Sequence, residues 1–175
     1  MYSKEFSNFH FQNFKMKYLL LIRHAKSDWA EPGLTDFERP LNKRGKKDAP
    51  AMAQRLLDKR IPVDALVSSP AVRAAATAVF FAEALQLEAK HLNELYLAEP
   101  ETIFSVVSSL NDVWNSVIIV SHNNGLTDFA NMLTNARIDN IPTCGVFAVK
   151  AECDSWTQFR QAKKEFLFFD YPKNI

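Results

Sequence analysis

The sequence has few cysteines and glycines and almost no excess of charge. Its 175 residues include 2 cysteines and 4 glycines, and the formal net charge at pH 7 is +1. Cys144 and Cys153 lack a CxxC spacing, which argues against a disulfide framework and a zinc site and indicates a reducing cytoplasm. The scarcity of glycine disfavours a Gly-rich phosphate loop and a dinucleotide-binding fingerprint. The balanced charge excludes a general attraction to nucleic acid or anionic lipid, so a preference for anions must come from a local cluster of cations.

Long apolar runs are missing as well. Val117–Val120, one of the longest, is far too short to cross a bilayer. The N-terminal residues scatter phenylalanine among polar residues and lack the apolar core and cleavage site of a signal peptide. We therefore predict an N-terminal extension without chemistry over residues 1–16 and a single domain over residues 17–175. We expect translation to start at either Met1 or Met16. No basic patch interleaved with aromatic residues indicates a nucleic-acid partner, and nothing indicates a membrane partner.

The sequence does contain the composition and periodicity of a globular α/β protein. Hydrophobic residues make up 47% and charged residues 23%. Short apolar runs predict strands at 17–23, 63–67, 117–120, 146–150 and 166–169. Helical spacing predicts helices at 42–59, 69–85, 100–110 and 125–133. This alternation predicts a three-layer α/β/α sandwich with a mostly parallel central sheet, in which the last two strands are antiparallel at or near the edge.

Three of the expected helices have recognisable starts. Asn42 is expected to cap the first, because an Asn side chain accepts hydrogen bonds from the free N–H groups of a first turn. Ser69 and Pro70 are expected to cap and open the second helix. Pro100 is expected to open the third, because proline suits the first helical position.

Four side chains suited to phosphoryl chemistry fall where an α/β sheet binds ligands, at the carboxyl ends of its strands. Arg23 and His24 follow the first strand, and His122 follows the strand at 117–120. Arg73 lies in the first turn of a helix that follows a further strand, where the helix dipole favours an anion. A single Arg or His at such a place is more often structural than catalytic. Together, four such residues from three segments indicate one site.

The residue types suit phosphoryl transfer. Arg23 and Arg73 present planar forks of donors that match phosphate oxygens. A neutral imidazole such as that of His24 is a nucleophile near neutral pH, and a second, protonated imidazole at His122 is expected to donate to the oxygens of the moving group. No cluster has metal-ligand spacing, so the prediction is a mechanism without metal or cofactor.

The run Leu21–Trp29 (LIRHAKSDW) resembles the signature of the histidine phosphatase superfamily, in which Arg-His is usually followed by Gly, here replaced by Ala25. The similarity continues in the family's order through Arg39–Leu41, Gly45, Ser68–Pro70, Arg73, Thr77, Leu92–Leu95 and Val120–Asn123. It covers the chain from Lys17 to about Lys150. The short length and the segment 36–41 resemble the compact SixA-type phosphohistidine phosphatases, which implies a phosphoglycerate mutase-like fold.

The resemblance also implies roles for individual residues. His24 would be the phosphorylated nucleophile, and Arg23, Arg73 and His122 would form the phosphate cage. Arg39 would add a pocket cation, although a solvated loop arginine is an equal alternative, and Ser27 would contribute to substrate binding at the rim. No metal or cofactor is implied.

Glu94 has two open interpretations. In larger relatives the glutamate of a similar Leu-Asn-Glu stretch handles the proton of the leaving group, so Glu94 is a candidate general acid. The alternative is a loop carboxylate that pairs with a neighbouring arginine. His10, His91 and Cys144 lack matching partners and are interpreted as structural or exposed residues.

The function predicted is a phosphatase that forms a phospho-His24 intermediate and acts on a phosphorylated substrate, such as a phosphohistidine protein. The first alternative is a small-ester phosphatase or a mutase of the same family, although a mutase usually needs a longer chain with a lid. The second is an inactive phosphate-binding module. The presence of both His24 and Arg73 argues against that module.

Overall fold

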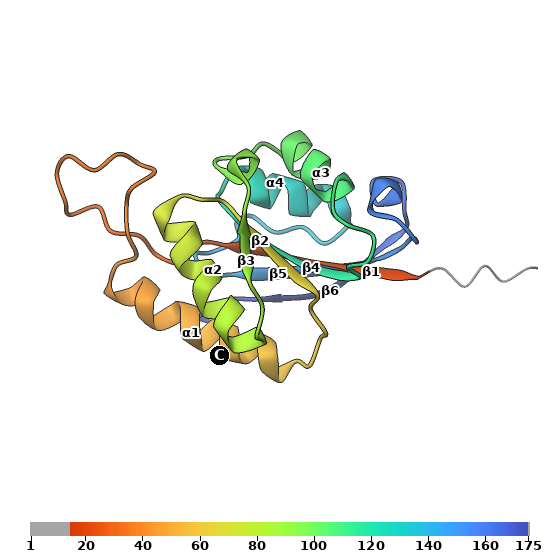
Figure 1. The fold of residues 1–175 in the computed structure, drawn as a ribbon, viewed down its shortest axis with the longest axis horizontal. Helices are drawn as coiled ribbons and strands as arrows, with labels where there is room; N and C mark the ends of the chain where they lie inside the picture. Colours follow the sequence, from red (N-terminus) through yellow and green to blue (C-terminus); the bar gives the residue numbers. More distant parts are fainter. Residues whose placement is uncertain (1–14, 175) are drawn as a thin grey trace, which may run out of the picture.

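The computed structural model describes residues 15–174 and confirms the predicted α/β sandwich of three layers (Figure 1). A six-stranded sheet in the order β3-β2-β4-β1-β5-β6 forms the middle layer. Its strands are β1 (Met16–Arg23), β2 (Ala65–Ser68), β3 (Ala89–His91), β4 (Ser116–Ser121), β5 (Val146–Glu152) and β6 (Lys164–Asp170). The helices are α1 (Lys43–Asp58), α2 (Val72–Leu85), α3 (Pro100–Ser108) and α4 (Gly125–Leu133). Residues 1–14 of the expected extension, with His10, lie outside the described residues, and Met16 begins β1.

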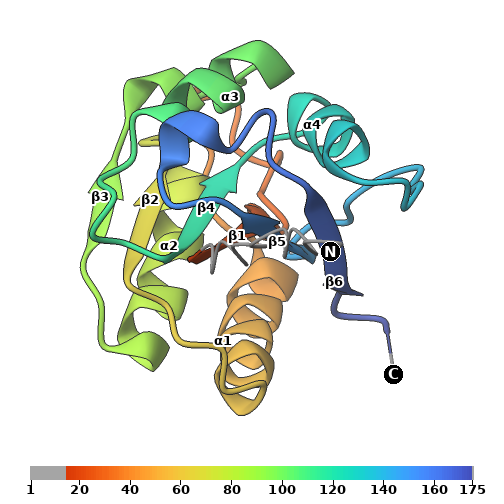
Figure 2. The ribbon, with the colours of Figure 1, turned by 90° about the vertical axis from the view of Figure 1, so that its right-hand side faces the viewer.

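The sheet is mostly parallel. β1, β2, β3 and β4 run in one direction, whereas β5 is antiparallel to β1 and β6 is antiparallel to β5 at the edge of the sheet (Figure 2). The two late strands therefore take the predicted orientation. Strand β3 was not predicted from the sequence, because its three residues, Ala89, Lys90 and His91, do not form an apolar run.

The apolar runs of the central strands follow from burial on both faces of the sheet. Along β1, Leu19 and Leu21 contact the core beneath α3 and α4, while Leu20 and Ile22 contact the core beneath α1 and α2. All four are fully buried, and each such side chain contributes about 1.5–3 kcal/mol when it leaves water. Helices α1 and α2 cover one face and α3 and α4 the other (Figures 1 and 2). A strand between two helical layers has no solvent-facing side, so polar alternation is lost.

The helix starts agree with two of the three predictions. The side chain of Asn42 accepts a hydrogen bond from the N–H of Gly45, and Pro100 is the first residue of α3. The prediction for Ser69 and Pro70 is wrong, because α2 begins at Val72 without a side-chain cap. The Ser69 hydroxyl, expected to cap this helix, accepts from the N–H of Ala71 over 3.3 Å, before the helix begins, and is also a partner of His122.

The segment between β1 and α1, residues 24–42, is here called the β1–α1 loop, and it projects beyond the carboxyl edge of the sheet (Figure 1). A bridge between Ser27 and Leu41 holds its base together. Gly45 lets α1 approach this base closely, because a Cβ there would lie 2.2 Å from the carbonyl oxygen of Lys26. Within residues 15–174, none of the helices has the length and apolar character needed to cross a membrane.

Candidate active site

The register of the sheet brings the predicted residues to one place. Arg23 at the end of β1 pairs with Ser121 at the end of β4, and Ser68 at the end of β2 pairs with Val120. The residues that follow these strands therefore meet at one edge. They surround a cavity of about 250 Å³. Its lining includes Arg23, His24, Ser27, Arg39, Arg73 and His122.

His24 lies in this cavity with its imidazole orientation fixed. Its Nδ1 is 2.8 Å from the carbonyl oxygen of Ala25, which can only accept a hydrogen bond, so Nδ1 carries the hydrogen. The other nitrogen, Nε2, then has the lone pair, and it accepts a hydrogen bond of 3.2 Å from Arg73 Nε. In this tautomer Nε2 is the ring nitrogen that can act as a nucleophile.

The charge state of His24 also suits a nucleophile. Its pKa is lowered to about 3, mainly by burial, with a partly opposing hydrogen bond to the carbonyl of Ala25 and additional lowering by the cations of Arg73, Arg23 and Arg39. Only 8% of the residue is exposed. At neutral pH the imidazole is therefore uncharged and its lone pair is available.

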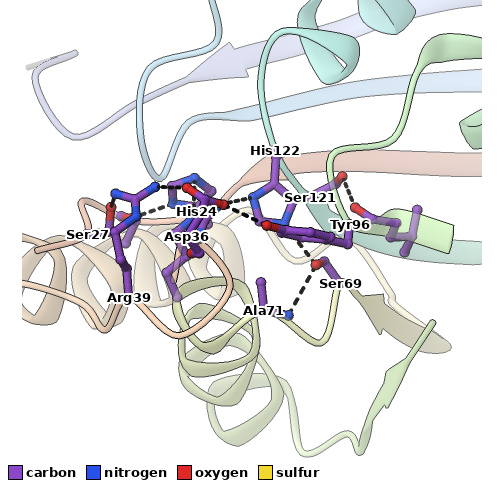
Figure 3. Close-up of polar contacts among 12 residues, drawn as sticks. His24, Ser27, Asp36, Arg39, Ser69, Ala71, Tyr96, Ser121 and His122 are labelled. Atoms are coloured by element: carbon purple, nitrogen blue, oxygen red, sulfur yellow. Dashed lines mark hydrogen bonds and ion pairs between the residues drawn. The ribbon is translucent and has the colours of Figure 1, made fainter. Parts of the chain in front are cut away.

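Arg73 connects the two histidines. It lies in the first turn of α2, only 2% exposed, and besides His24 it donates from Nη2 to His122 Nδ1 over 3.1 Å. A second contact from Nη2 reaches the carboxylate of Asp36 at 2.8 Å. The rings of His24 and His122 lie side by side with their centroids 5.0 Å apart and their planes tilted by 53° (Figure 3). One guanidinium group thus orients both imidazoles.

His122 is neutral in this ligand-free site, and its protonation during phosphoryl transfer stays a prediction. Its Nδ1 accepts from Arg73, which has no acceptor, so the hydrogen is on Nε2, 2.8 Å from the Ser69 hydroxyl oxygen. The pKa of His122 is lowered to about 3, mainly by burial and additionally by the nearby His24 and Arg73, against a partly opposing contribution from Asp36. These neighbours come from other segments, and their distances could not be derived from the sequence.

Arg39 stands at the mouth of the cavity. Its Nη1 donates to the Ser27 hydroxyl over 2.9 Å, and its guanidinium carbon lies 3.5 Å from the ring centroid of Trp29. Its Nη2 pairs with the carboxylate of Asp36. Arg39 is buried, so it is a cation of the cavity and not a solvated loop residue.

Arg23 lines the cavity and keeps unused hydrogen-bonding capacity. Its Nη1 donates to the carbonyl of Ile141 over 2.8 Å and to Asn140 over 3.2 Å, whereas its Nε is buried without a partner. In the described part of the chain, Nε of Arg39 and Oδ1 of Asn123 are also buried and unpartnered. All three residues line the cavity, and buried polar atoms without partners are uncommon outside sites that a ligand or water completes.

Glu94 does not reach the cavity. It lies in a short 3-10 turn, Asn93–Leu95, is exposed, and lines a separate hollow beside α3. Tyr96, two residues further on, does reach the site: its ring stands edge-on to His122 at 5.4 Å, and its hydroxyl donates to Asp36 (Figure 3).

Three residues of the site were not predicted: Asp36, Ser69 in its contact with His122, and Tyr96. Asp36 could have been predicted from the sequence, because it begins the segment 36–41 that resembles SixA-type proteins. Nothing in the sequence marked Tyr96. Within residues 15–174, no group of three or more His, Cys, Asp or Glu side chains is arranged to hold a metal ion.

Known proteins resemble this chain in sequence and fold. The model of the histidine phosphatase superfamily (branch 1) matches residues 19–96. A solved structure from Agrobacterium tumefaciens, assigned as the phosphohistidine phosphatase SixA, is 27% identical with a TM-score of 0.76, over 89% of this chain and 98% of that one. A structure of the protein histidine phosphatase SixA complexed with tungstate is 20% identical with a TM-score of 0.76, over 90% and 98% of the two chains. Phosphoserine phosphatase 1 of Hydrogenobacter thermophilus is 42% identical over 72 residues, which are 40% of this chain and 33% of that protein.

Residues 19–96 therefore match the histidine phosphatase superfamily, and the resemblance of the chain to SixA-type structures is confirmed. Its fold is the phosphoglycerate mutase-like fold of that superfamily. The matched range contains Arg23, His24, Arg39 and Arg73, and the family match supports phosphatase activity.

Proposed function

We propose that the protein is a phosphohistidine phosphatase that transfers a phosphoryl group to Nε2 of His24 and then to water. One observation carries the proposal: the neutral His24 imidazole has its lone pair on Nε2 inside a cavity lined by Arg23, Arg39 and Arg73. Phosphoryl transfer needs mainly positioning and charge stabilisation, and three arginines supply both without a metal.

In the first step, the Nε2 lone pair of His24 attacks phosphorus while the bond between phosphorus and the leaving nitrogen breaks. The arginines hold the non-bridging oxygens. A phosphoryl dianion next to His122 favours its protonated form, so His122 becomes a donor to these oxygens once substrate is bound. The leaving imidazole takes a proton from water.

In the second step, water attacks the phosphorus of phospho-His24. The phosphorus–Nε2 bond breaks, its electron pair returns to His24, and the water proton passes to solvent. The products are inorganic phosphate and the neutral enzyme. Ser69 keeps the His122 ring in place through its contact of 2.8 Å, so the donor stays aimed at the same oxygens in both steps.

Phosphohistidine is favoured as substrate because, within residues 15–174, Asp36 is the carboxyl residue that lines the cavity, and it is not poised to protonate a leaving alkoxide. Burial raises the pKa of Asp36, but hydrogen bonds from Arg39, Arg73 and Tyr96 outweigh it and hold that pKa well below its usual range, so Asp36 is ionised. An alkoxide is a poor leaving group without a general acid, which contributes roughly 10²–10⁴-fold. A histidine leaving group, with an ordinary pKa of about 6.5, takes its proton from solvent.

A small phosphate ester is the second candidate substrate. The match to a phosphoserine phosphatase over 72 residues favours it, although that match spans 33% of the other protein. We place either activity in the cytoplasm, and the two free, buried cysteines support a reducing compartment.

The experiment that separates the candidates compares three substrates at equal concentration: a phosphohistidine protein, a phosphoserine peptide and an alkyl phosphate ester. The expected result is hydrolysis of phosphohistidine at a kcat/KM at least tenfold above either ester, in line with the general-acid contribution that this site lacks. Faster hydrolysis of an ester would assign the protein to the small-ester branch. His24→Ala and Arg73→Ala variants serve as controls for contaminating phosphatases.

A further inference from the structure

We propose that Asp36 competes with the phosphoryl group for the phosphate cage. Its carboxylate binds Arg39 and Arg73 until a phosphoryl group displaces it. The inference rests on the proposed function, because it gives the same two arginines to the phosphoryl group. It assigns Asp36 a part in setting the affinity for substrate and product.

The contacts of Asp36 are those that a phosphoryl group would make. One carboxylate oxygen pairs with Arg39 Nη2, and the other lies 2.8 Å from Arg73 Nη2 (Figure 3). Tyr96 donates its hydroxyl to the second oxygen over 2.9 Å. Two guanidinium groups and a hydroxyl around one anion form a site for an oxyanion. The carboxylate is therefore an internal substitute for phosphate.

Arg73 has little capacity left while Asp36 is bound. A guanidinium group has five N–H donors. Nε donates to His24, Nη1 donates to the backbone carbonyl of Asp36, and Nη2 donates to the Asp36 carboxylate and to His122. These contacts use four of the five donors. A phosphoryl group that is held through Nη1 and Nη2 must therefore replace one of these partners.

Asp36 is the partner that can leave. His24 and His122 directly follow central strands and are almost fully buried, so their positions are fixed by the sheet. Asp36 lies in the exposed part of the β1–α1 loop, and 42% of its side chain is exposed. The base of that loop is held separately, by the bridge between Ser27 and Leu41. The Asp36 side chain can therefore turn away from the two arginines while the loop backbone stays in place, because the N–H of Val72 holds the carbonyl of Phe37 over 3.0 Å.

The exchange favours a phosphoryl group over the carboxylate because the attraction to two cations grows with the charge of the anion. A phosphoryl dianion displaces a carboxylate monoanion, and after hydrolysis the returning carboxylate helps to release inorganic phosphate. The apparent dissociation constant of an oxyanion then equals the intrinsic constant divided by the fraction of molecules in which Asp36 has left the cage.

The test compares Asp36→Asn with Glu31→Gln. Asp36→Asn keeps the side-chain shape and removes the charge, and Glu31→Gln removes one charge from the same exposed loop at a residue that does not line the cavity of His24 and Arg73. Isothermal titration calorimetry measures the dissociation constant of inorganic phosphate, and steady-state kinetics measures KM and kcat for phosphohistidine. We expect Asp36→Asn to bind phosphate roughly tenfold more tightly than the parent, the effect of losing one charged competitor. KM should fall in parallel, and Glu31→Gln should change neither constant by more than about twofold.

Unchanged or weaker phosphate binding in Asp36→Asn would overturn the inference, since weaker binding would mean that the carboxylate organises the arginines. An Arg73→Ala variant separates this failure from that of the proposed function. If the parent binds phosphate and Arg73→Ala does not, a lack of response to Asp36→Asn overturns this inference alone. If the parent binds no phosphate, the proposed function and this inference fail together.

Discussion

Arg73 Nε donates to His24 Nε2 over 3.2 Å, so the nitrogen proposed as nucleophile contacts a buried cation in the ligand-free protein. The opposite nitrogen of the same ring is held by the carbonyl of Ala25. Together these contacts set the tautomer and the orientation of the imidazole, and the cation helps to keep it neutral. A change at Arg73 therefore affects both the nucleophile and the phosphate cage.

Replacing Arg73 with lysine should cost activity, although the charge is kept. A single ammonium group cannot reach His24, His122 and a phosphoryl oxygen at once. Loss of one to two charged hydrogen bonds, each worth about 1.5–3 kcal/mol, predicts a fall in kcat/KM of at least tenfold for Arg73→Lys and a larger fall for Arg73→Ala. Arg160→Lys, in an exposed pair with Glu101, is the control and should leave kcat/KM unchanged. Equal rates for Arg73→Lys and the parent would argue against bidentate holding.

The stability of the ligand-free protein should fall below pH 6.5. Burial lowers the pKa of both His24 and His122 to about 3 in the folded state, against an ordinary value of about 6.5 in the unfolded chain. As the pH falls from 6.5 toward 3, the two histidines become protonated in the unfolded chain but stay neutral in the folded protein. The free energy of unfolding then decreases by up to about 1.4 kcal/mol per pH unit for each imidazole.

Urea unfolding at several pH values between 7.5 and 4 measures this dependence. His24→Asn should have a shallower pH dependence than the parent, because one of the two buried imidazoles is gone. The control His91→Asn, at an exposed position in β3, should retain the parent's dependence. The same slope in His24→Asn and the parent would show that the pKa of His24 in the folded protein is not lowered as expected.

Much of the fold and the core of the site could be predicted because they depend on neighbours in the sequence. The strands that end at Arg23 and Ser121 are continuous apolar runs, and a parallel sheet brings their ends together. The presence of His24, the proposed nucleophile, and of Arg73 in the cavity follows from the same placement. These predictions needed no knowledge of side-chain distances.

The remaining features depend on the path of the β1–α1 loop and on side-chain directions. Asp36 reaches Arg73 only because the loop folds back over the cavity, and no periodicity describes such a path. Glu94 was a candidate by its position in the motif, but the 3-10 turn directs it to another surface and brings Tyr96 to the site. Ser69 follows a strand and precedes a helix, so its cap role and its contact with His122 could not be distinguished.

Glu94→Gln should affect neither phosphohistidine nor ester hydrolysis by more than about twofold, the range of surface substitutions away from a site. Its carboxylate lines a hollow beside α3 and touches no residue of the cavity. The measurement is kcat/KM for a phosphohistidine protein and an alkyl ester in both proteins. Selective loss of ester hydrolysis, with phosphohistidine hydrolysis spared, would restore Glu94 as a general acid.

Activity should survive EDTA and should be inhibited by vanadate. The mechanism assigns phosphate holding to arginines, so chelation removes nothing that the reaction needs. Vanadate in its trigonal-bipyramidal form resembles the transferring phosphoryl group, and enzymes bind such analogues more tightly than substrate. Initial rates with and without each compound test both expectations. Loss of activity in EDTA that a divalent metal restores would contradict the metal-free mechanism.

The most direct test of the central claim is to trap the phosphoenzyme. Rapid quench during turnover, followed by peptide mass spectrometry under alkaline conditions, locates the phosphoryl group. We predict an acid-labile, alkali-stable phosphoryl group on His24, attached through Nε2, and its absence from a folded His24→Ala variant that does not turn over substrate. A phosphoryl group on Ser27, Ser69 or a cysteine during turnover would contradict the proposed mechanism.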